Sequence, residues 1–462
     1  MKAVSFINDL VWSPPLVILL IFAGLWFTVR TRFVQVRHFP EMLRSLFARK
    51  SGENKGISSF EAFCMALSGR IGTGNIVGVA TAIAFGGPGS VFWMWIIAFF
   101  GAATAFVEST LAQTYKFHHK TVSRGGPFSY IEEGLHMRWL ALLFAGFCIV
   151  GYGLCLTTVQ ANGMSSALAN SFGLSPLAGG IILAVVLALV IFGGVKSISK
   201  VASVVTPFMA LGYIVLALVV IGANLEAVPS VFKMIFTNAF GINPVCGGIL
   251  GSTIIMGVKR GIFSNEAGQG GGAIVSASAD VTHPVRQGLA QSFSVYVDTL
   301  LVCTATALMI LTSGTYNVFD SATGEMLLAG APQLGDNYVG YTQAAVDTVF
   351  TGFGSKFVGI ALVFFVFTTI MTYYFYSESS IMYLTRGAAH PRLEKALVLV
   401  LRLMMIGATI FGALREANVV WQLGDIGVGV MAWINVIAIL ILGGKAFSAL
   451  RDYEKEISAK RR

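Results

Sequence analysis

Long apolar runs separated by short polar segments dominate the chain and predict an all-helical protein that crosses a membrane many times. A helix needs about 20 mostly apolar residues to cross the hydrocarbon core of a bilayer. Eleven runs meet this length within a few residues, so we expect eleven transmembrane helices. They cover residues 12–29, 59–86, 89–114, 139–161, 177–195, 201–223, 246–279, 289–312, 353–376, 396–414 and 420–443.

Two of these runs, 59–86 and 246–279, are too long for one uninterrupted helix. Each carries a polar, glycine-rich interruption, at residues 72–75 and 263–268, about 190 residues apart. Unwound backbone in hydrocarbon costs several kcal/mol per unsatisfied group, so it persists only where protein, water or a bound solute satisfies it. A break in the middle of a span is therefore a predicted binding point for something polar.

Each broken run opens a block of five runs, residues 59–223 and residues 246–443. Five is an odd number, so the second block enters the membrane with the opposite orientation, as in an inverted repeat. Paired, interrupted segments at matching positions of two halves predict a transporter with its binding site near the bilayer midplane. Residues 1–58 then supply one extra N-terminal helix and a basic loop, and residues 444–462 form a basic tail.

The first break offers groups of both polarities to a solute. The half-helix that starts after Asn75 has free N–H groups and a positive dipole end, which suit a carboxylate. The half-helix that ends near Ile71 has carbonyl oxygens, which suit an amine or Na⁺. The alternative is a packing motif of small residues, but packing alone does not explain Asn75 or the adjacent Arg70 at midspan.

The second break adds a carboxylate and an aromatic ring to the glycines. An ionisable residue inside a span is a functional hypothesis by default. Glu266 is either a structural partner of Arg70 across the two halves or a partner of a substrate amine. Phe263 either packs in the core or forms a hydrophobic gate over the solute.

Other polar residues within the runs have alternative interpretations too. Thr368, Thr369 and Thr372 lie along one side of their run, where their hydroxyls could bind Na⁺ or bond back to their own helix. Gln160 either contacts the solute or forms an interhelical hydrogen bond. Two acidic residues are interpreted as structural or gating partners for the basic residues within the runs: Glu108 and Asp298 for Arg70, Lys259 and Arg260.

The composition supports a multi-pass membrane protein. Of the 462 residues, 55% are hydrophobic and 11% are charged, against about 25% charged in soluble domains. The net charge of +9 comes from basic residues between the runs, and 23 of the 31 Lys and Arg fall on one side if the N-terminus is outside. Cytoplasmic loops carry such an excess, so we expect the cell membrane, an outside N-terminus, a cytoplasmic C-terminus and no nucleic-acid partner. The acidic loop at 313–352 is expected to pack as an extracellular cap.

Other function classes lack their signatures. A membrane enzyme would need a catalytic constellation at depth, whereas the six histidines lie in loops or near the ends of runs. We therefore expect no enzyme activity, and no cofactor besides a co-transported ion. An exchanger or a proton-coupled carrier that uses the buried carboxylates remains the alternative to sodium coupling.

Two long motifs resemble the alanine or glycine:cation symporter family, and the similarity covers nearly the whole chain. The first motif is Arg70-Ile71-Gly72-Thr73-Gly74-Asn75-Ile76-Val77-Gly78-Val79-Ala80, followed by Gly86-Gly87-Pro88-Gly89 and Gly125-Gly126-Pro127. The second is Lys259-Arg260-Gly261-Ile262-Phe263-Ser264-Asn265-Glu266-Ala267-Gly268. The resemblance implies a LeuT-type inverted-repeat fold and Na⁺-coupled, in some members H⁺-coupled, uptake of small neutral amino acids, chiefly alanine or glycine and in some members glutamine.

The resemblance also implies where the ligands bind. The substrate carboxylate would meet Thr73, Gly74 and Asn75, and the amine would meet the carbonyl side of Phe263, Ser264 and Asn265. Gln160, Gly268 and Thr368 complete the expected substrate site. A sodium ion would lie between the carbonyl groups of Ser68 and Ile71 and the hydroxyls of Thr368 and Thr369 or Thr372. Membrane lipids are the other expected partners, and a monomer is compatible with this arrangement.

One segment departs from the family pattern. After Gly268 the family has a small polar stretch such as Gly-Ser-Ala-Pro, whereas this chain has Gln269-Gly270-Gly271-Gly272. The resemblance therefore does not separate alanine from glycine or glutamine as the substrate.

Overall fold

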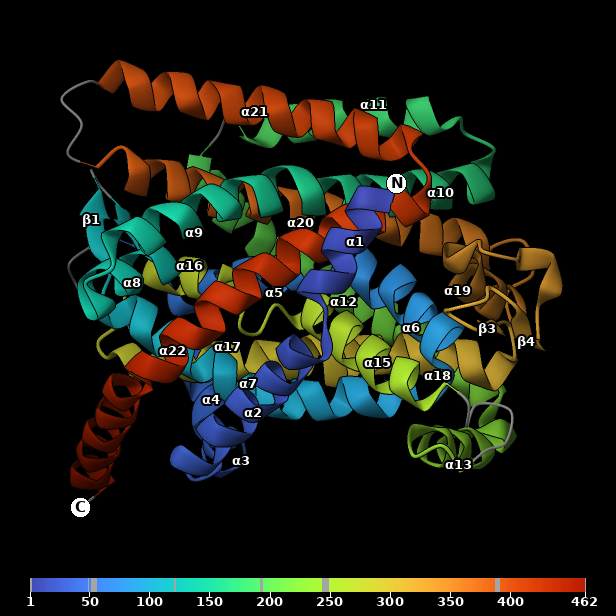
Figure 1. Cartoon of the computed structure of the whole chain (residues 1–462), viewed down its shortest axis with the longest axis horizontal. Helices are drawn as coiled ribbons and strands as arrows, with labels where there is room; N and C mark the ends of the chain where they lie inside the picture. Colours follow the sequence, from blue (N-terminus) through green and yellow to red (C-terminus); the bar gives the residue numbers. More distant parts are fainter. Residues whose placement is uncertain are drawn as a thin grey trace.

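A computed structural model gives the fold of the chain and describes residues 2–48, 50, 56–119, 122–191, 194–242, 249–386 and 391–461. The body is a bundle of long helices that run roughly along one direction, with a small β-hairpin at either end (Figure 1). The start of the predicted second half, residues 246–248, and residues 192–193 of the predicted fifth run lie outside the described residues.

Eight helical segments are long and apolar enough to cross a membrane, and each matches one of the predicted runs. Three of the eight are interrupted or bent. They are Ala3–Arg30 (α1 Lys2–Val11, α2 Pro14–Arg30), Arg138–Phe172 (α9 Arg138–Val150, η2 Gly151–Leu156, α10 Thr157–Phe172) and Pro284–Ser313 (α17 Pro284–Val295, η4 Tyr296–Cys303, α18 Thr304–Ser313). The other five are α7 Ser90–Thr114, α12 Gly194–Ala223, α20 Gly354–Leu384, α21 Pro391–Leu414 and α22 Ala417–Arg461.

The remaining three predicted runs consist of shorter helices, so the count of eleven spans stays a prediction. The run at 177–195 holds α11 (Pro176–Ile191). The two broken runs hold α5 (Ser59–Arg70), the π-helical turn η1 (Gly74–Gly78) and α6 (Val79–Gly86), and then α15 (Leu250–Asn265) and α16 (Gly271–Ala277).

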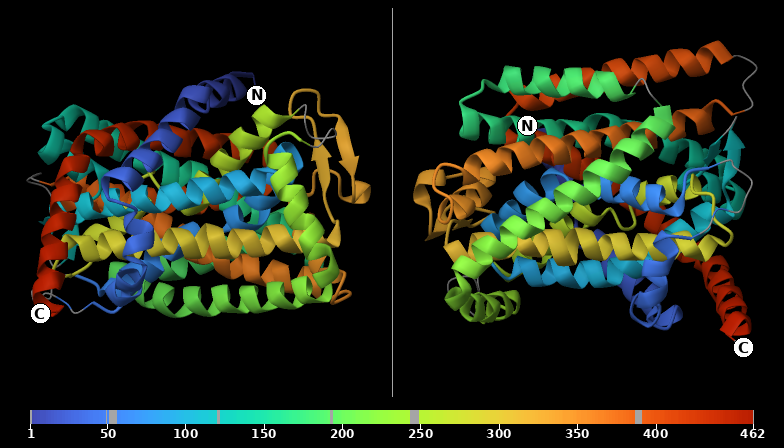
Figure 2. Two further views of the ribbon diagram at one scale, coloured as in Figure 1. Left: turned by 90° about the horizontal axis from the view of Figure 1, so that it is seen from below. Right: turned by 180° about the vertical axis from the view of Figure 1, so that it is seen from behind.

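The two ends of the bundle carry the short elements. One end holds α3 (Val34–Arg37), α4 (Phe39–Leu46), α8 (Pro127–Leu135) and the hairpin β1–β2 (Phe117–His119, Val122–Arg124), which pairs Phe117 with Arg124. The other end holds η3 (Leu225–Ala227), α13 (Val228–Ala239), η5 (Pro332–Leu334), α19 (Tyr338–Asp347) and the hairpin β3–β4 (Asn317–Phe319, Met326–Ala329), which pairs Asn317 with Ala329. Both views of Figure 2 place β3–β4 and the C-terminus at opposite ends of the bundle. The predicted cap at 313–352 is thus a folded layer.

The basic tail differs from the sequence expectation. Residues 444–462 were expected as a tail separate from the last span, but α22 continues without a break to Arg461. Its C-terminal turns project beyond the bundle (Figure 1), and Glu454 there forms ion pairs with Arg37 at 2.6 Å and His38 at 2.9 Å.

The two broken runs lie antiparallel in the centre of the bundle. Helix α15 packs against α6, and α16 packs against α5, so the two breaks meet between them. At the far end of this pair, the backbone of Ile57 bonds with Ser278 and Asp280 at 3.0 and 2.9 Å. A capping box of Ser58 and Glu61 starts α5 beside this contact, as a Ser with Glu three residues later predicts.

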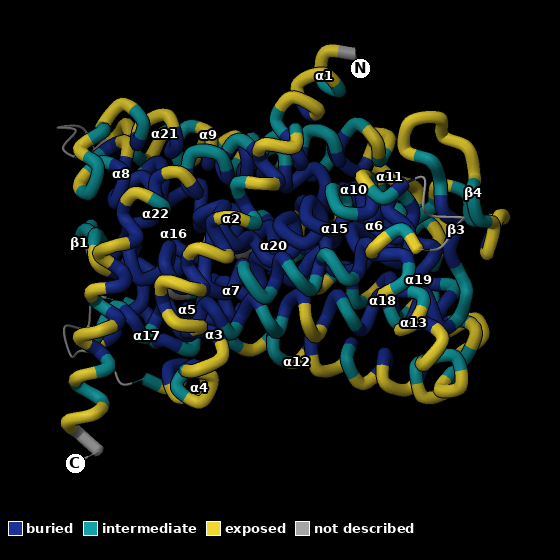
Figure 3. Tube along the Cα trace, turned by 60° about the horizontal axis from the view of Figure 1, so that its bottom comes forward, coloured by how far each residue is buried: buried dark blue, intermediate teal, exposed yellow. Residues whose placement is uncertain are grey.

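Burial is inverted relative to a soluble protein. The central helices α5, α16 and α20 are buried (Figure 3), although they carry many of the polar side chains. Large apolar side chains such as Leu189, Phe208 and Leu403 are 77%, 81% and 62% exposed on the outer helices. Such exposure is unfavourable in water and is expected of a surface that faces lipid.

Candidate functional site

The first break occurs where the sequence predicts it. Helix α5 ends at Arg70, and Ile71 is extended with a ψ of 97°. The side-chain oxygen of Asn75 accepts a hydrogen bond from the backbone N–H of Gly72 at 2.8 Å, so Asn75 stabilises the turn between the two half-helices. The helical chain resumes at Gly74, two residues before the predicted start after Asn75, as the π-helical turn η1.

Gln160 and Thr369 reach the first break from two other helices. The backbone N–H of Thr73 donates to the side-chain oxygen of Gln160 at 2.8 Å. A Cβ atom on Gly72 would lie 2.7 Å from that oxygen and 2.7 Å from the hydroxyl of Thr369. A larger residue at position 72 would have to displace the Gln160 side chain and the Thr369 hydroxyl. Gln160 and Thr73 of the expected substrate site thus lie beside Thr369 of the expected sodium site.

A cluster of oxygen atoms surrounds the Thr369 hydroxyl. This hydroxyl lies 2.9 Å from the carbonyl oxygen of Ser68, 3.0 Å from that of Ile71 and 2.7 Å from that of Phe365. Thr368 bonds instead to its own helix, with Phe364 and Phe365 both at 3.0 Å. The Phe365 contact is a bond from Thr369 to its own helix four residues earlier, which is the alternative that the sequence left open.

Thr372 lies one turn further along α20. Its hydroxyl is 2.7 Å from the Ser68 hydroxyl and 3.1 Å from the Thr368 carbonyl oxygen. It thus joins α20 to α5 beside the oxygen cluster of Thr369, Ser68, Ile71 and Phe365.

The second break begins later than predicted. Phe263, Ser264 and Asn265 belong to the last turn of α15, and the irregular segment is 266–270. Glu266 adopts the left-handed conformation with a φ of +54°, and Gly268 and Gly270 have φ values of +88° and +95°. The run of glycines, whose backbone tolerates positive φ, thus places the break after Asn265 and not at Phe263.

Asp298 links the two breaks. The Asn75 amide donates to one of its carboxylate oxygens at 2.7 Å, and the Ser264 hydroxyl donates to the other at 2.9 Å. Thr299 adds a third donor at 2.7 Å. The sequence predicts a basic partner for Asp298, whereas neutral donors bond its carboxylate.

Arg70 bonds across the two halves without forming the expected ion pair. Its Nε donates to the carbonyl oxygen of Asn265 at 2.6 Å and its Nη1 donates to Gln291 at 3.1 Å and to the Ser294 hydroxyl. Among the described residues, no ion pair joins Arg70 to Glu266 or to Glu108. Glu266 instead accepts from the Tyr376 hydroxyl at 3.0 Å, and Glu108 accepts from the Asn435 amide at 2.9 Å.

Phe263 lies directly over the first break. A Cβ atom on Gly74 would be 3.2 Å from its ring. On its other side the ring packs against Trp421, with ring centroids 4.9 Å apart. The guanidinium of Arg260 lies 4.5 Å from the Trp421 ring centroid, so two aromatic rings and a cation form a layered cover over Gly74.

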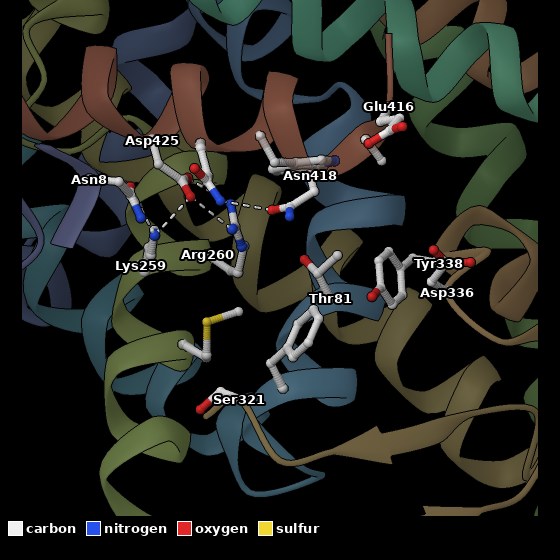
Figure 4. Close-up of a pocket in the computed structure, with 15 residues that line it drawn as sticks. Asn8, Thr81, Lys259, Arg260, Ser321, Asp336, Tyr338, Glu416, Asn418 and Asp425 are labelled. Atoms are coloured by element: carbon white, nitrogen blue, oxygen red, sulfur yellow. Dashed lines mark hydrogen bonds and ion pairs between the residues drawn. The ribbon is translucent and has the colours of Figure 1, made fainter. Parts of the chain in front are cut away.

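An ion-pair cluster fixes this cover. Arg260 binds both carboxylate oxygens of Asp425 at 2.8 and 3.0 Å, and Lys259 binds Asp425 at 2.8 Å. Asp425 lies between the two cations in Figure 4. Lys259 and Arg260 thus pair with Asp425 and not with Glu108 or Asp298, contrary to expectation. The sequence offered a signal for Asp425, because an acidic residue within an apolar run is unusual.

A cavity of about 660 Å³ opens on the far side of this cover. Asp336 and Tyr338 face the ion-pair cluster across it (Figure 4). A second cavity of about 440 Å³ shares Trp421 and Tyr338 with the first. Both cavities adjoin the layer formed by residues 313–352, and Trp421 separates them from Phe263. The two aromatic rings therefore lie between these cavities and the helix breaks.

Comparisons with known proteins identify the fold and the family. The model of the "sodium:alanine symporter family" matches residues 1–462. A candidate sodium/proton-dependent alanine carrier of Bacillus subtilis (strain 168) is 50% identical over 98% of this chain and 92% of its own. The sodium/proton-dependent alanine carrier protein of Bacillus sp. (strain PS3) is 47% identical over 90% of this chain and 92% of its own. The crystal structure of MhsT in complex with L-phenylalanine has a TM-score of 0.58 at 13% identity, over 86% of this chain and 99% of that one. The fold is thus of the LeuT type.

Proposed function

The chain belongs to the sodium:alanine symporter family, and from that premise we propose that it carries a small neutral amino acid and Na⁺ together across the cell membrane. It is a multi-pass membrane transporter and not an enzyme. The observation that carries the proposal is the meeting of two helix breaks beside the oxygen cluster of Thr369, Ser68, Ile71 and Phe365.

The substrate carboxylate binds at the first break. The N–H groups of Thr73, Gly74 and Asn75 start the half-helix of η1 and α6, where the dipole is positive. Gln160 accepts from the Thr73 N–H at 2.8 Å, and the incoming carboxylate takes over part of this bonding. The amine binds the carbonyl groups in the last turn of α15, at Phe263 and Ser264, which have no donors within the helix. Gly268 supplies the positive-φ turn beyond them.

The space beside Gly74 supports a small side chain on the substrate. Phe263 lies in van der Waals contact with Gly74, and Trp421 supports its ring. Alanine and glycine require the smallest movement of this cover. Glutamine binds only if Phe263 rotates away.

Sodium is a co-substrate held by oxygen atoms alone. The carbonyl groups of Ser68 and Ile71 and the hydroxyl of Thr369 form its shell, and the hydroxyl of Thr368 joins it only by releasing the bonds to its own helix. Thr372 lies one turn away and positions Ser68 through its hydroxyl. Hard oxygen ligands suit a hard cation. Because the ion contacts the C-terminal end of α5 and the middle of α20, Na⁺ binding holds these two helices together and favours one state of the carrier.

The orientation of the protein in the membrane follows from the distribution of its basic residues. The end with β1–β2 and the C-terminus faces the cytoplasm, because the basic segments gather there. The cavity of about 660 Å³ then opens to the outside, and the two five-helix blocks at 59–223 and 246–443 move relative to each other during alternating access.

Uptake into proteoliposomes tests the proposal. Labelled alanine, glycine and glutamine are offered with and without an inward Na⁺ gradient across vesicles that hold the purified protein. Accumulation above equilibrium only with the gradient is the expected result, and the three substrates are ranked by kcat/KM. Uptake that proceeds equally without Na⁺ would refute sodium coupling.

A further inference from the structure

Two buried carboxylates flank Arg70 on the side of the second break away from the entrance cavity. Glu108 and Glu266 are 0% and 1% exposed, and Arg70 is 2% exposed. Arg70 lies within electrostatic range of both acids. The Asn435 side chain connects Glu108 to the second break, since its amide donates to Glu108 and to the carbonyl oxygen of Gly268, both at 2.9 Å.

The polar atoms of this group are not satisfied by the protein. Glu108 lies within hydrogen-bonding reach of the backbone N–H groups of Gly268 and Gly270, whereas one carboxylate oxygen of Glu266 and the Nη2 atom of Arg70 are buried without a hydrogen-bond partner among the described residues. The same holds for the Tyr152 hydroxyl. A Cβ atom on Gly271 would lie 2.7 Å from both Glu266 and this hydroxyl. Unpaired buried polar atoms are costly, so this group is incomplete without a further ligand.

The balance of charge identifies the missing ligand. The group holds one guanidinium, Arg70, and two carboxylates, Glu108 and Glu266, while Asp298, which three neutral donors bond, lies within electrostatic range of Arg70 and Glu266. Negative charge is in excess when these acids are ionised, and an unbalanced charge at this depth costs several kcal/mol. One bound proton reduces the excess. The ionisable groups that face Glu266 from the packed helices are Arg70 (α5), Glu108 (α7), Cys148 (α9), Tyr152 (η2), Asp298 (η4), and Tyr373 and Tyr376 (α20).

Glu266 is also linked to the proposed sodium site. Its carboxylate accepts from the Tyr376 hydroxyl at 3.0 Å. A Cβ atom on Gly69 would lie 2.5 Å from the same hydroxyl, so Tyr376 contacts the backbone between Ser68 and Arg70. Sodium at Ser68 and Ile71 adds a positive charge at this point, which stabilises an ionised Glu266 without the proton.

The backbone at Glu266 is suited to a change of state. A φ of +54° is rare for a residue with a side chain, and such conformations cluster at sites that switch. Glu108, in contrast, lies in the regular interior of α7.

We infer that Glu266 binds one proton when the sodium site is empty and releases it to water when Na⁺ binds, with Glu108 and Arg70 setting the charge balance. The O–H bond of the carboxyl group breaks, the proton passes to the aqueous phase, and the carboxylate remains. This inference rests on the proposed sodium-coupled symport and adds to it a proton that competes with Na⁺. By reciprocal linkage, a lower pH must then weaken Na⁺ binding.

The experiment measures the Na⁺ concentration for half-maximal alanine uptake at pH 6 and pH 8, with wild type and Glu266→Gln in proteoliposomes. In wild type this concentration rises as the pH falls, by up to about tenfold per pH unit for one competing proton. In Glu266→Gln, whose amide cannot ionise, it is the same at both pH values. Glu133→Gln is the matched control, because Glu133 lies at the cytoplasmic end, half exposed beside Arg386, and keeps the wild-type dependence.

Each outcome supports or overturns the inference. Wild-type uptake that depends on Na⁺ but not on pH overturns it and leaves the proposed symport intact, whereas no Na⁺-dependent uptake at all defeats the symport itself. A Glu266→Gln variant with the wild-type pH dependence also overturns it. If Glu266→Gln does not fold, Glu108→Gln provides the second test. It leaves one acid beside Arg70, so Glu266 stays ionised and the dependence between pH 6 and pH 8 is lost.

Discussion

The carbonyl oxygen of Ile71 lies 3.0 Å from the hydroxyl of Thr369, although 298 positions separate the two residues in the chain. The contact joins the end of a broken helix in the first half to a continuous helix in the second. An ion bound there contacts both halves, so its binding depends on their relative position. This relationship leads directly to a test of the sodium site.

Thr369→Val should raise the Na⁺ concentration for half-maximal uptake about tenfold or more, because it removes one oxygen ligand while keeping the shape of the side chain. One lost polar contact of about 1.4 kcal/mol corresponds to a factor of ten. The maximal rate at saturating Na⁺ should stay close to wild type. Uptake of labelled alanine across a series of Na⁺ concentrations measures both quantities.

Thr369→Ser is the matched control, since it keeps the hydroxyl and should keep the wild-type Na⁺ requirement. A fall in maximal rate with an unchanged Na⁺ requirement in Thr369→Val would instead assign Thr369 to packing.

Gly74→Leu should abolish uptake while the protein still inserts into the membrane. The added Cβ would lie 3.2 Å from Phe263 and 3.4 Å from the backbone of Ser264, and the rest of the leucine would fill the space of the substrate. Gly78→Ala, one turn away, meets only ordinary contacts at 3.7 Å or more and should transport normally. Protein content in the membrane and alanine uptake are measured together. Normal uptake by Gly74→Leu would remove the first break from the substrate site.

The sequence predicted those features that depend on hydropathy and on glycine. Apolar runs located all eight long helices, and the glycine and asparagine at residues 72–75 located the first break. The predicted second break starts too early in the chain. Phe263, Ser264 and Asn265 are polar or bulky, but they do not break a helix. Positive φ at Glu266, Gly268 and Gly270 ends the helix instead, and only glycine content signals such a turn in advance.

Pairing partners could not be predicted, because they depend on how distant helices rotate toward each other. Lys259 and Arg260 find Asp425, which is 165 positions beyond Arg260, although Asp298 is much nearer in the chain. Asp298 contacts Asn75, Ser264 and Thr299 instead, because the crossing of the two breaks turns these neutral side chains toward it.

Asp425→Asn should destabilise the protein, because it leaves two buried cations without a carboxylate. Breaking a buried ion pair on one side costs about 3–5 kcal/mol, and Lys259 and Arg260 are 8% and 5% exposed. A lower melting temperature in detergent is the expected result. Glu416→Gln changes an exposed acid on the same cavity and should melt as wild type does. Equal melting of the two variants would contradict a structural role for the Asp425 cluster.

Phe263→Ala should shift selectivity from alanine toward glutamine. The ring fills the space between Gly74 and Trp421, and its removal opens room for a longer side chain while the contact with the alanine methyl is lost. A difference of one or two methylene groups in a pocket is worth about 1–3 kcal/mol, so the ratio of kcat/KM for glutamine over alanine should rise about tenfold or more.

Phe128→Ala is the matched control. Phe128 is similarly buried but stacks on Tyr383 at the end of the bundle that holds β1–β2, with centroids 4.7 Å apart, so its removal lowers stability without changing the ratio. If both variants changed the ratio equally, the effect would come from general loosening of the bundle, and Phe263 would have no special place over the substrate.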